Sequence, residues 1–249
     1  MTNNAIVIIM AGGMGKRMNS TIPKVLHPIN GTPMLVHVIK EAEMIAPFKI
    51  LVVVGKYKDA IKKTVEEGVN NSNIVYVTQE TPLGTGHAIQ CCVPEMMQYG
   101  NADTKVVVLS GDVPLLHNST ITSLISGKSS VSIITTHLEN PSGYGRVIEI
   151  DGRVVGIVEE KDCNTEQKKI NQINGGIYCF NCDMLCKRLS ELSNANAQKE
   201  YYLTDMIGIL RTKENARVTA MVLSESQQYQ IMGVNTPDQL RELEKISKL

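Results

Sequence analysis

The chain has 249 residues, of which 43% are hydrophobic, so it can bury a core of substantial size. Lysine plus arginine and aspartate plus glutamate number 25 each, and tryptophan is absent, so the chain lacks the positive field of a nucleic-acid-binding domain. No apolar run approaches the roughly 20 residues that cross a bilayer, and the short N-terminal apolar run lacks the basic leader of a signal peptide. We therefore expect a cytoplasmic protein with neither a nucleic-acid nor a membrane partner.

Strand-like apolar runs alternate with helix-like segments along the chain. Strands are predicted at 5–10, 49–54, 74–77, 105–109, 131–136, 146–150, 153–158, 173–180 and 217–223. Helices are predicted at 33–46, 57–67, 85–98, 118–126, 182–193, 202–214 and 236–247. This alternation is typical of an α/β fold with a Rossmann-like, mostly parallel sheet and helices on both faces.

The pattern changes in the middle of the chain. Two apolar-rich runs, RVIEI and RVVGIV, flank Asp151 and Gly152, and Asp-Gly between such runs predicts a two-residue hairpin. A hairpin interrupts the strand–helix alternation, so we predict an inserted lobe over about 138–215. The core then comprises about 1–137 and 216–249, and the lack of a clear linker predicts one continuous domain, 1–249.

A glycine-rich segment follows the first predicted strand. It reads AGGMGKRM at 11–18 and is followed by Lys24. Glycines let backbone N–H groups approach an anion and the basic residues neutralise it, so the segment suits a polyphosphate, although an ordinary strand-to-helix turn would also fit. Its spacing is neither that of a Walker A loop nor GxGxxG. Gly111 and Asp112 also follow a strand, and because ligands of such sheets bind at the carboxyl ends of strands, the two segments should meet at one crevice.

The six cysteines are few for a disulfide scaffold in a chain of this length. Cys179, Cys182 and Cys186 have a spacing that zinc or an iron–sulfur cluster could use. No second cluster completes four ligands, however, and Cys179 lies in a strand-like run where cysteine acts as a small apolar residue. We expect reduced thiols.

Short blocks along nearly the whole chain carry the functional signal. They are AGGMGKRM, PKVLHPINGTPML (23–35), QETPLGTGHA (79–88), LSGDVPLL (109–116), NPSGYGRV (140–147), GIVEEKD (156–162), INGGI (173–177), NAQKEYYLTD (196–205) and GVNTPDQL (233–240). In this order they resemble the sugar-1-phosphate nucleotidyltransferases, and most of all the uridyltransferase half of the bacterial bifunctional uridyltransferase/acetyltransferases. The resemblance implies the nucleotide-diphospho-sugar transferase type of fold, with the inserted lobe binding the sugar.

The implied reaction transfers the uridylyl group of UTP to N-acetylglucosamine-1-phosphate, giving UDP-N-acetylglucosamine and pyrophosphate. A phosphomonoester is largely ionised at neutral pH, so neither a protein nucleophile nor a general base is needed, and catalysis depends on cations and positioning. The alternatives are the same chemistry on glucose-1-phosphate, another sugar phosphate or another nucleotide, and a non-catalytic nucleotide-sugar sensing module. Because the sequence lacks the hexapeptide repeats of the bacterial acetyltransferase β-helix, we expect a stand-alone uridyltransferase, whose state as monomer or homo-oligomer stays open.

The resemblance also implies the residues of the site. Arg17 would act near the departing pyrophosphate and Lys24 near the α-phosphate, while Asp112 and Asn235 would hold Mg²⁺, which prefers few protein oxygens beside phosphate and water. The implied nucleotide-binding residues are Met10, Ala11, Gly12, Gly13, Gln79, Gly84, Thr85 and Gly111. The implied sugar-binding residues are Gly145, Glu159, Asn174, Tyr202 and Thr204.

Gln79 is expected to read the base, because a side-chain amide offers a donor and an acceptor that can pair bidentately with uracil. Three residues depart from the pattern of the bifunctional enzymes. Gly12 replaces a common alanine, Ser110 replaces an aromatic or small residue, and Glu160 stands where histidine is frequent. None of these changes removes a proposed charge or ligand.

Overall fold

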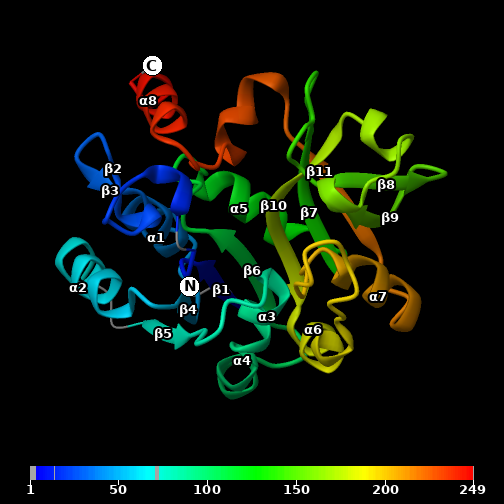
Figure 1. Ribbon diagram of the computed structural model, residues 1–249. Helices are drawn as coiled ribbons and strands as arrows, with labels where there is room; N and C mark the ends of the chain where they lie inside the picture. The colour runs from blue at the N-terminus through cyan, green and yellow to red at the C-terminus, as the bar shows by residue number, and fades with distance from the viewer. Residues whose placement is uncertain (1–3, 14, 71–72, 249) are drawn as a thin grey trace.

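A nine-stranded sheet forms the centre of the computed structural model, which describes residues 4–13, 15–70 and 73–248 (Figure 1). Its strands within these ranges are β1 (Ala5–Met10), β4 (Lys49–Val54), β5 (Ile74–Thr78), β6 (Lys105–Ser110), β7 (Val131–His137), β8 (Arg146–Ile150), β9 (Arg153–Val158), β10 (Gln172–Asn181) and β11 (Val218–Val222). The order is β11-β7-β10-β6-β1-β4-β5, with the β8–β9 hairpin attached to β10. A separate two-stranded ribbon pairs β2 (Pro28–Ile29) with β3 (Thr32–Pro33).

Most of the sheet is parallel. β1 pairs in parallel with both β4 and β6, β4 with β5, and β11 with β7. β10 runs antiparallel between β6 and β7. The predicted α/β class with a mostly parallel sheet is therefore confirmed, and so is the existence of every predicted strand to within one or two residues.

Helices cover both faces of the sheet, as Figure 1 shows with α1 and α5 above it and α3, α4 and α6 below it. The helices are α1 (Met34–Glu43), α2 (Lys58–Gly68), α3 (Thr85–Gln90), α4 (Val93–Tyr99), α5 (Asn118–Ser126), α6 (Cys182–Arg188), α7 (Asp205–Lys213) and α8 (Pro237–Ile246). Short 3₁₀ turns lie at η1 (Lys16–Met18), η2 (Lys24–Leu26), η3 (Glu160–Asp162), η4 (Gln167–Lys169), η5 (Leu189–Glu191) and η6 (Glu225–Ile231).

The alternation of side chains along the strands explains the two layers. In β1, Ile6 and Ile8 pack into the core beneath α3, α4, α6 and α7, whereas Val7 and Ile9 pack into the core beneath α1, α2 and α5. A strand buried on both faces reads as a continuous apolar run, which is how AIVIIM appears in the sequence. The third, smaller core lies under α8.

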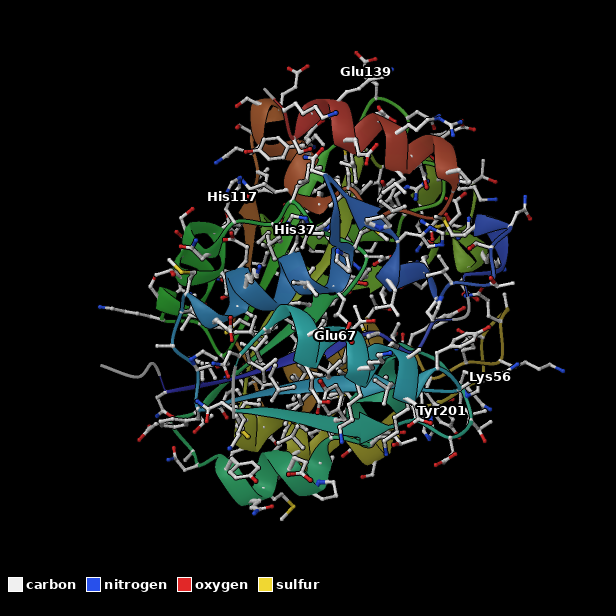
Figure 2. All side chains as sticks on the ribbon, turned by 90° about the vertical axis from the view of Figure 1, so that its left-hand side faces the viewer. His37, Lys56, Glu67, His117, Glu139 and Tyr201 are labelled. Atoms are coloured by element: carbon white, nitrogen blue, oxygen red, sulfur yellow. The ribbon has the colours of Figure 1, made fainter. Side chains whose placement is uncertain are left out.

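The surface helix α2 is mostly polar, in contrast to the apolar strand β1. Only Ile61 and Val65 are buried, and Figure 2 places Glu67 on the outer side of the helix. No helix in the described part of the chain is long and apolar enough to cross a membrane.

One predicted helix is divided in two. The segment expected as a single helix over 85–98 forms α3 and α4, which meet at Cys91 and Cys92. Pro94 lies in the first turn of α4, where its missing N–H costs nothing, but inside a continuous helix its ring would clash with the carbonyl four residues earlier.

The hairpin at Asp151 and Gly152 forms as predicted. Both residues have positive φ, 50° and 69°, as a tight two-residue turn with the right-handed twist of its strands requires. The division into a core and a lobe over 138–215 stays a prediction. Within that range, β10 is part of the central sheet, and the β8–β9 hairpin branches from it.

Candidate functional site

The carboxyl ends of β1 and β6 lie side by side at one crevice. Because the two strands are paired along their whole length, Met10 lies beside Ser110, and the Gly111 N–H donates to the carbonyl of Met10 at 3.0 Å. Two adjoining cavities open here, of about 450 and 280 Å³, and Met10, Ser110 and Thr85 line both. The glycine-rich segment and Gly111–Asp112 therefore meet at one edge of the sheet.

A compact polar network lies at the junction of the two cavities. Lys24 Nζ forms an ion pair with Asp112 Oδ2 and donates to Asn235 Oδ1 at 3.2 Å. Arg17 donates to the same Asn235 oxygen at 2.9 Å. Four residues spread over more than 200 positions of the sequence are thus brought together.

The oxygens of Asp112 and Asn235 converge on one cation. Lys24 Nζ lies between a carboxylate oxygen and a neutral amide oxygen, so the two side chains already share a positively charged neighbour. These are oxygen donors of the kind that Mg²⁺ takes in small number while phosphate and water complete its shell. The donor set therefore fits Mg²⁺ bound together with a phosphate substrate. No group of three or more histidine, cysteine, aspartate or glutamate side chains in the described residues could hold a metal by itself.

Neighbouring hydrogen bonds fix the two oxygen donors. Ser110 Oγ donates to Asp112 Oδ1 at 2.6 Å, which leaves Oδ2 toward Lys24. Asn235 donates its backbone N–H to Gln239 Oε1 at 2.7 Å. Thr236 and Gln239 form a capping box at the start of α8. The start of α8 therefore positions Asn235.

Gly15 allows the glycine-rich loop to pack directly on Lys24. Its φ is +59°, and a Cβ there would lie 2.6 Å from the Cβ of Lys24. Only glycine combines this conformation with so close an approach. The loop therefore supports the stem of Lys24. Residue 14 and the side chain of Lys16 lie outside the described part of the chain.

Gln79 closes the smaller cavity. Its Nε2 donates to the carbonyl of Gly84 at 3.1 Å and lies 3.0 Å from His87 Nδ1, so both amide hydrogens are directed at the protein. Its Oε1 faces the loop at Gly12, whose Cβ, if present, would lie 3.7 Å away. The carbonyl end of Gln79 is therefore the end that is available to a ligand.

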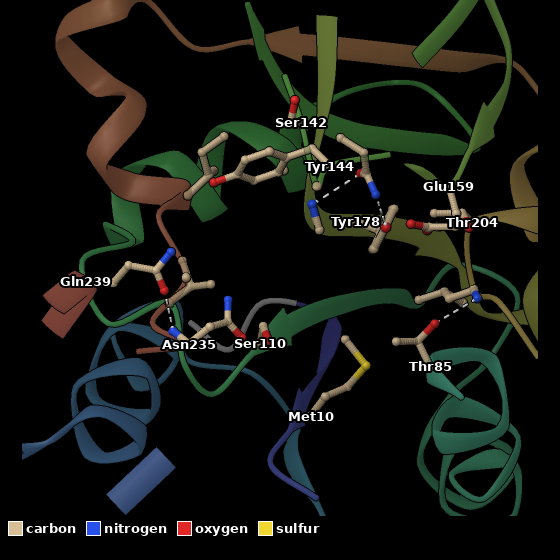
Figure 3. Close-up of a pocket in the computed structure, with 18 of the residues that line it drawn as sticks. Met10, Thr85, Ser110, Ser142, Tyr144, Glu159, Tyr178, Thr204, Asn235 and Gln239 are labelled. Atoms are coloured by element: carbon tan, nitrogen blue, oxygen red, sulfur yellow. Dashed lines mark hydrogen bonds between the residues drawn. The ribbon is translucent and has the colours of Figure 1, made fainter. Parts of the chain in front are cut away.

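A second group of polar side chains lies across the larger cavity, as Figure 3 shows for Glu159, Thr204 and Tyr178. Thr204 Oγ1 donates to Glu159 Oε1 at 2.9 Å. Asn174 Nδ2 donates to the hydroxyl of Tyr178 at 2.7 Å. These groups come from the end of β9, from β10 and from the turn before α7, so they form one wall opposite Asn235 and Arg17.

Burial alters the protonation of this wall. Desolvation raises the pKa of Glu159, an effect that the hydrogen bond from Thr204 partly offsets and that the nearby carboxylates of Asp205, Asp162 and Glu200 reinforce. Burial also raises the pKa of Tyr178, so its hydroxyl stays protonated and can donate. Gly145 lies directly below, where a Cβ would be 3.5 Å from Glu159 Oε2.

Most of the residues that the resemblance assigned line one of the two cavities. These are Met10, Gly12, Gly13, Arg17, Lys24, Gln79, Gly84, Thr85, Asp112, Glu159, Asn174, Thr204 and Asn235. Four do not: Ala11, Gly111, Gly145 and Tyr202. Ala11 is 2% exposed and packs in the core, Gly111 and Gly145 contribute backbone beneath the cavities, and Tyr202 is 6% exposed. These four lie outside the cavity linings, and the roles of all the assigned residues in binding or catalysis stay predictions.

Several lining residues were not singled out from the sequence. Tyr144 and Ser142 overhang the larger cavity from the loop before β8, Tyr178 lies in its wall and Gln239 lies at its edge. The sequence could have indicated Tyr144 as a lining residue, because it lies inside the NPSGYGRV block. It could not have indicated Tyr178, because an aromatic residue in an apolar strand is ordinarily part of the core.

The cysteines take no part in this site. All six are free thiols, and Cys179 is buried in β10 while Cys182 and Cys186 lie on α6.

Comparisons with known proteins identify the family to which the chain belongs. The family model for nucleotidyl transferases matches residues 6–225. The chain is 38% identical over 253 residues to the "Probable UDP-N-acetylglucosamine pyrophosphorylase" of Acanthamoeba polyphaga mimivirus, covering 100% of this chain and 98% of that protein. It is 42% identical over 246 residues to the "Bifunctional protein GlmU" of Clostridium botulinum, covering 97% of this chain and 51% of that protein, so it spans about half the length of these bifunctional relatives. The fold also matches a solved structure of UDP-glucose pyrophosphorylase complexed with UDP-glucose, with a TM-score of 0.75 at 20% identity over 100% of this chain and 99% of that one.

The chain therefore belongs to the nucleotidyl transferase family. Within it, the protein is a sugar-1-phosphate nucleotidyltransferase, an enzyme that joins a nucleotide to a sugar phosphate.

Proposed function

We propose that the protein transfers the uridylyl group of UTP to N-acetylglucosamine-1-phosphate, giving UDP-N-acetylglucosamine and pyrophosphate. The observation that carries the proposal is the arrangement of Lys24, Asp112, Asn235 and Arg17 at the junction of two cavities, one suited to a nucleotide and one to a sugar. A relative whose printed name gives this activity as probable is 38% identical to this chain over 253 residues.

The base would occupy the smaller cavity. Uracil carries a hydrogen on N3, and Gln79 Oε1 can accept it, while the Nε2 hydrogens stay on Gly84 and His87. Cytosine presents an acceptor at N3, which would face this oxygen unfavourably. Gln79 thus contributes one half of the bidentate pairing expected from the sequence, and backbone N–H groups of the glycine-rich loop would serve the uracil carbonyls.

The phosphates would lie over the cation cluster. Asp112 and Asn235 would hold Mg²⁺, which would supply positive charge that neutralises the phosphates. Lys24 and Arg17 add positive charge on the two sides of Asn235, which lowers the repulsion between the attacking sugar phosphate and the triphosphate. Since the attacking phosphate oxygen is already ionised, these residues orient and neutralise rather than move a proton.

The sugar would lie against the second wall. Glu159 can accept from a sugar hydroxyl through the oxygen that Thr204 does not occupy, and the protonated Tyr178 and the Asn174 amide can hold an acetamido group or a hydroxyl. A charged hydrogen-bonding partner of this kind contributes roughly 1.5–3 kcal/mol. This wall is therefore the part of the site on which sugar preference depends.

The test is pyrophosphate release with UTP, Mg²⁺ and either N-acetylglucosamine-1-phosphate or glucose-1-phosphate, with Asp112→Asn as the inactive control. We expect release with the acetylated sugar, a loss of at least about 100-fold in the variant, and an unchanged circular dichroism spectrum. Release with glucose-1-phosphate alone would keep the chemistry and refute the sugar assignment. Full activity in Asp112→Asn would refute the metal assignment.

A further inference from the structure

A second groove lies away from the proposed active site. It encloses about 770 Å³ between the β8–β9 turn, the last turn of α7 and the strand β11. Its lining includes Arg153 from β9, Arg211 from α7 and Arg217, which immediately precedes β11. None of these residues lines either cavity of the proposed active site.

One side of the groove is the edge of β11 that faces away from β7, and β9 lies near this strand without pairing with it. In the described residues β11 pairs with β7 alone. The carbonyl of Arg217 accepts from Val131 and the N–H of Leu223 donates to Thr135, so the odd-numbered residues direct their backbone groups toward β7. Because backbone direction alternates along a strand, Val218, Ala220 and Val222 direct their N–H and C=O groups into the groove. All three line it.

The arginines of the groove have no partner of their own. Arg153, Arg211 and Arg217 form neither an ion pair nor a side-chain hydrogen bond with any residue that the structure describes. The contrast is with Arg146, Arg188 and Arg241, each of which pairs with a carboxylate. Glu149 is the one acidic residue among the lining residues, and its Oε1 accepts from Gln172 at 3.1 Å. The groove therefore carries excess positive charge.

Apolar side chains accompany this charge. Val222, which lines the groove, is 50% exposed at the end of β11. A strand edge that lacks a hydrogen-bonded neighbour and carries apolar side chains pairs readily with another extended chain. The groove thus combines free backbone groups, an apolar contact and positive charge.

We propose that this groove binds an extended, acidic peptide segment of a partner protein, which pairs with β11 as an additional strand. Backbone groups of Val218, Ala220 and Val222 would bond the peptide, and its carboxylates would meet Arg153, Arg211 and Arg217. A second copy of this chain fits poorly, because a symmetric interface would bring the two sets of arginines together.

A pair of labelled synthetic peptides tests the proposal. One alternates glutamate with valine, and the matched control has lysine in place of glutamate. We expect fluorescence anisotropy to report binding of the acidic peptide only, and amide hydrogen exchange to slow at Ala220 and Val222. Binding of both peptides with equal affinity, or no binding of the acidic peptide at millimolar concentration, would overturn the proposal.

Substitutions separate charge from strand pairing. Reversing the charge at all three positions (Arg153→Glu, Arg211→Glu, Arg217→Glu) should lower the affinity for the acidic peptide by at least about tenfold, because three exposed ion pairs are lost. The same variant should bind the lysine peptide more tightly than the acidic one. Ala220→Pro removes an N–H that faces the groove and spares the bonds to β7, so it should also weaken binding, whereas Ala220→Ser should not.

Pyrophosphate release from the proposed substrates should be unchanged in every variant, which shows that each one folds. An unchanged peptide affinity in the charge-reversal variant would refute the proposal. Displacement of the peptide by inorganic pyrophosphate, without protection of the β11 amides, would refute it in favour of a small-anion site.

Discussion

Glu159 shows how one residue can trade stability for binding. Its carboxylate is desolvated, which raises its pKa, and one of its oxygens is already bonded to Thr204. A carboxyl whose folded-state pKa lies above its unfolded-state pKa binds protons more readily when folded. Its charged form therefore lowers stability at neutral pH, and that loss is recovered as pH falls through the folded-state pKa.

We predict that Glu159→Gln raises the free energy of unfolding at neutral pH, because it removes a buried charge and keeps an oxygen for Thr204 to donate to. The gain should shrink as pH is lowered through the raised pKa of Glu159. The same variant should raise KM for the sugar phosphate by roughly 10- to 100-fold, since a charged hydrogen bond is lost, with little effect on KM for UTP. Urea unfolding at several pH values and steady-state kinetics measure the two effects. Glu166→Gln, at an exposed glutamate that directly precedes η4 and pairs with Lys169, should change neither.

The sequence predicted which residues would lie together at the candidate site better than it predicted their supporting contacts. Asp112 and Asn235 stand in motifs whose resemblance is clear, and the structure brings them together through Lys24. Ser110 and Gln239 hold these two side chains. Their hydrogen bonds depend on the rotation of short side chains and on a helix start, and neither leaves a pattern in a single sequence.

At the scale of elements, the N-terminal cap of α8 holds the proposed metal ligand Asn235 in place. The hydroxyl of Thr236 accepts from the backbone N–H of Gln239, and the side-chain Oε1 of Gln239 accepts from the backbone N–H of Asn235. We predict that Thr236→Val costs about 1 kcal/mol, because an N-cap is lost, and lowers Tm by roughly 2–4 °C for a chain of this size. It should also raise the Mg²⁺ concentration required for half-maximal activity, since Asn235 loses its support.

Calorimetry and a Mg²⁺ titration test this prediction. Thr212→Val is the matched control, because Thr212 is an exposed helix residue whose hydroxyl bonds within α7. A Mg²⁺ requirement that moves equally in both variants would show that the cap of α8 does not position Asn235.

The loop before β8, beside the wall proposed to bind the sugar, is held by an ion pair between the buried Arg146 and the partly exposed Glu160. Arg146 is 1% exposed, and its guanidinium lies 2.7 Å from Glu160 Oε2, which also accepts from the N–H of Gly143 at 3.2 Å. That contact lowers the pKa of Glu160, first through the hydrogen bond from Arg146. Glu160 thus joins the loop before β8 to η3, directly beside Glu159.

We predict that Glu160→Leu destabilises the protein by up to about 3 kcal/mol, because it leaves a buried guanidinium unpaired, with the value reduced by the partial exposure of Glu160. The double variant Arg146→Met, Glu160→Leu should recover part of the loss, since the unpaired charge is gone. Both variants should raise KM for the sugar phosphate more than KM for UTP. Urea unfolding of both single variants and the double variant completes the cycle, and purely additive losses would refute the coupling.

At the scale of the whole molecule, the strands and their class could be predicted, but their neighbours could not. The apolar residues at 173–180 predicted a strand, but nothing in this run indicated that β10 would lie antiparallel between β6 and β7. Sheet order is set by contacts between distant segments, whereas the alternation of apolar residues is local. The helix break differs, because Pro94 is a local signal in the sequence that disfavours one continuous helix, so the prediction of a single helix over 85–98 was wrong at this position.

Segments from the whole length of the chain meet at the proposed nucleotide site. Met10 and Lys24 come from the first strand and the segment after it, Gln79 directly follows β5, Asp112 lies in the turn after β6 and Asn235 lies just before α8. Unfolding must separate all of them, so a ligand that spans the site opposes global unfolding.

We predict that UTP with Mg²⁺ at about 100 times its Kd stabilises the folded protein by roughly 2.7 kcal/mol, which corresponds to a rise in Tm of about 5–11 °C for a chain of this size. Asp112→Asn should lose most of this shift, because the phosphates and the metal lose their shared anchor. Asp183→Asn makes the same change at an exposed position on α6 and should keep the full shift. Thermal unfolding of the three proteins with UTP, with Mg²⁺ and with both together measures the effect. Equal shifts in Asp112→Asn and the unaltered protein would place the nucleotide elsewhere, because a ligand stabilises the folded state only through the contacts it makes there.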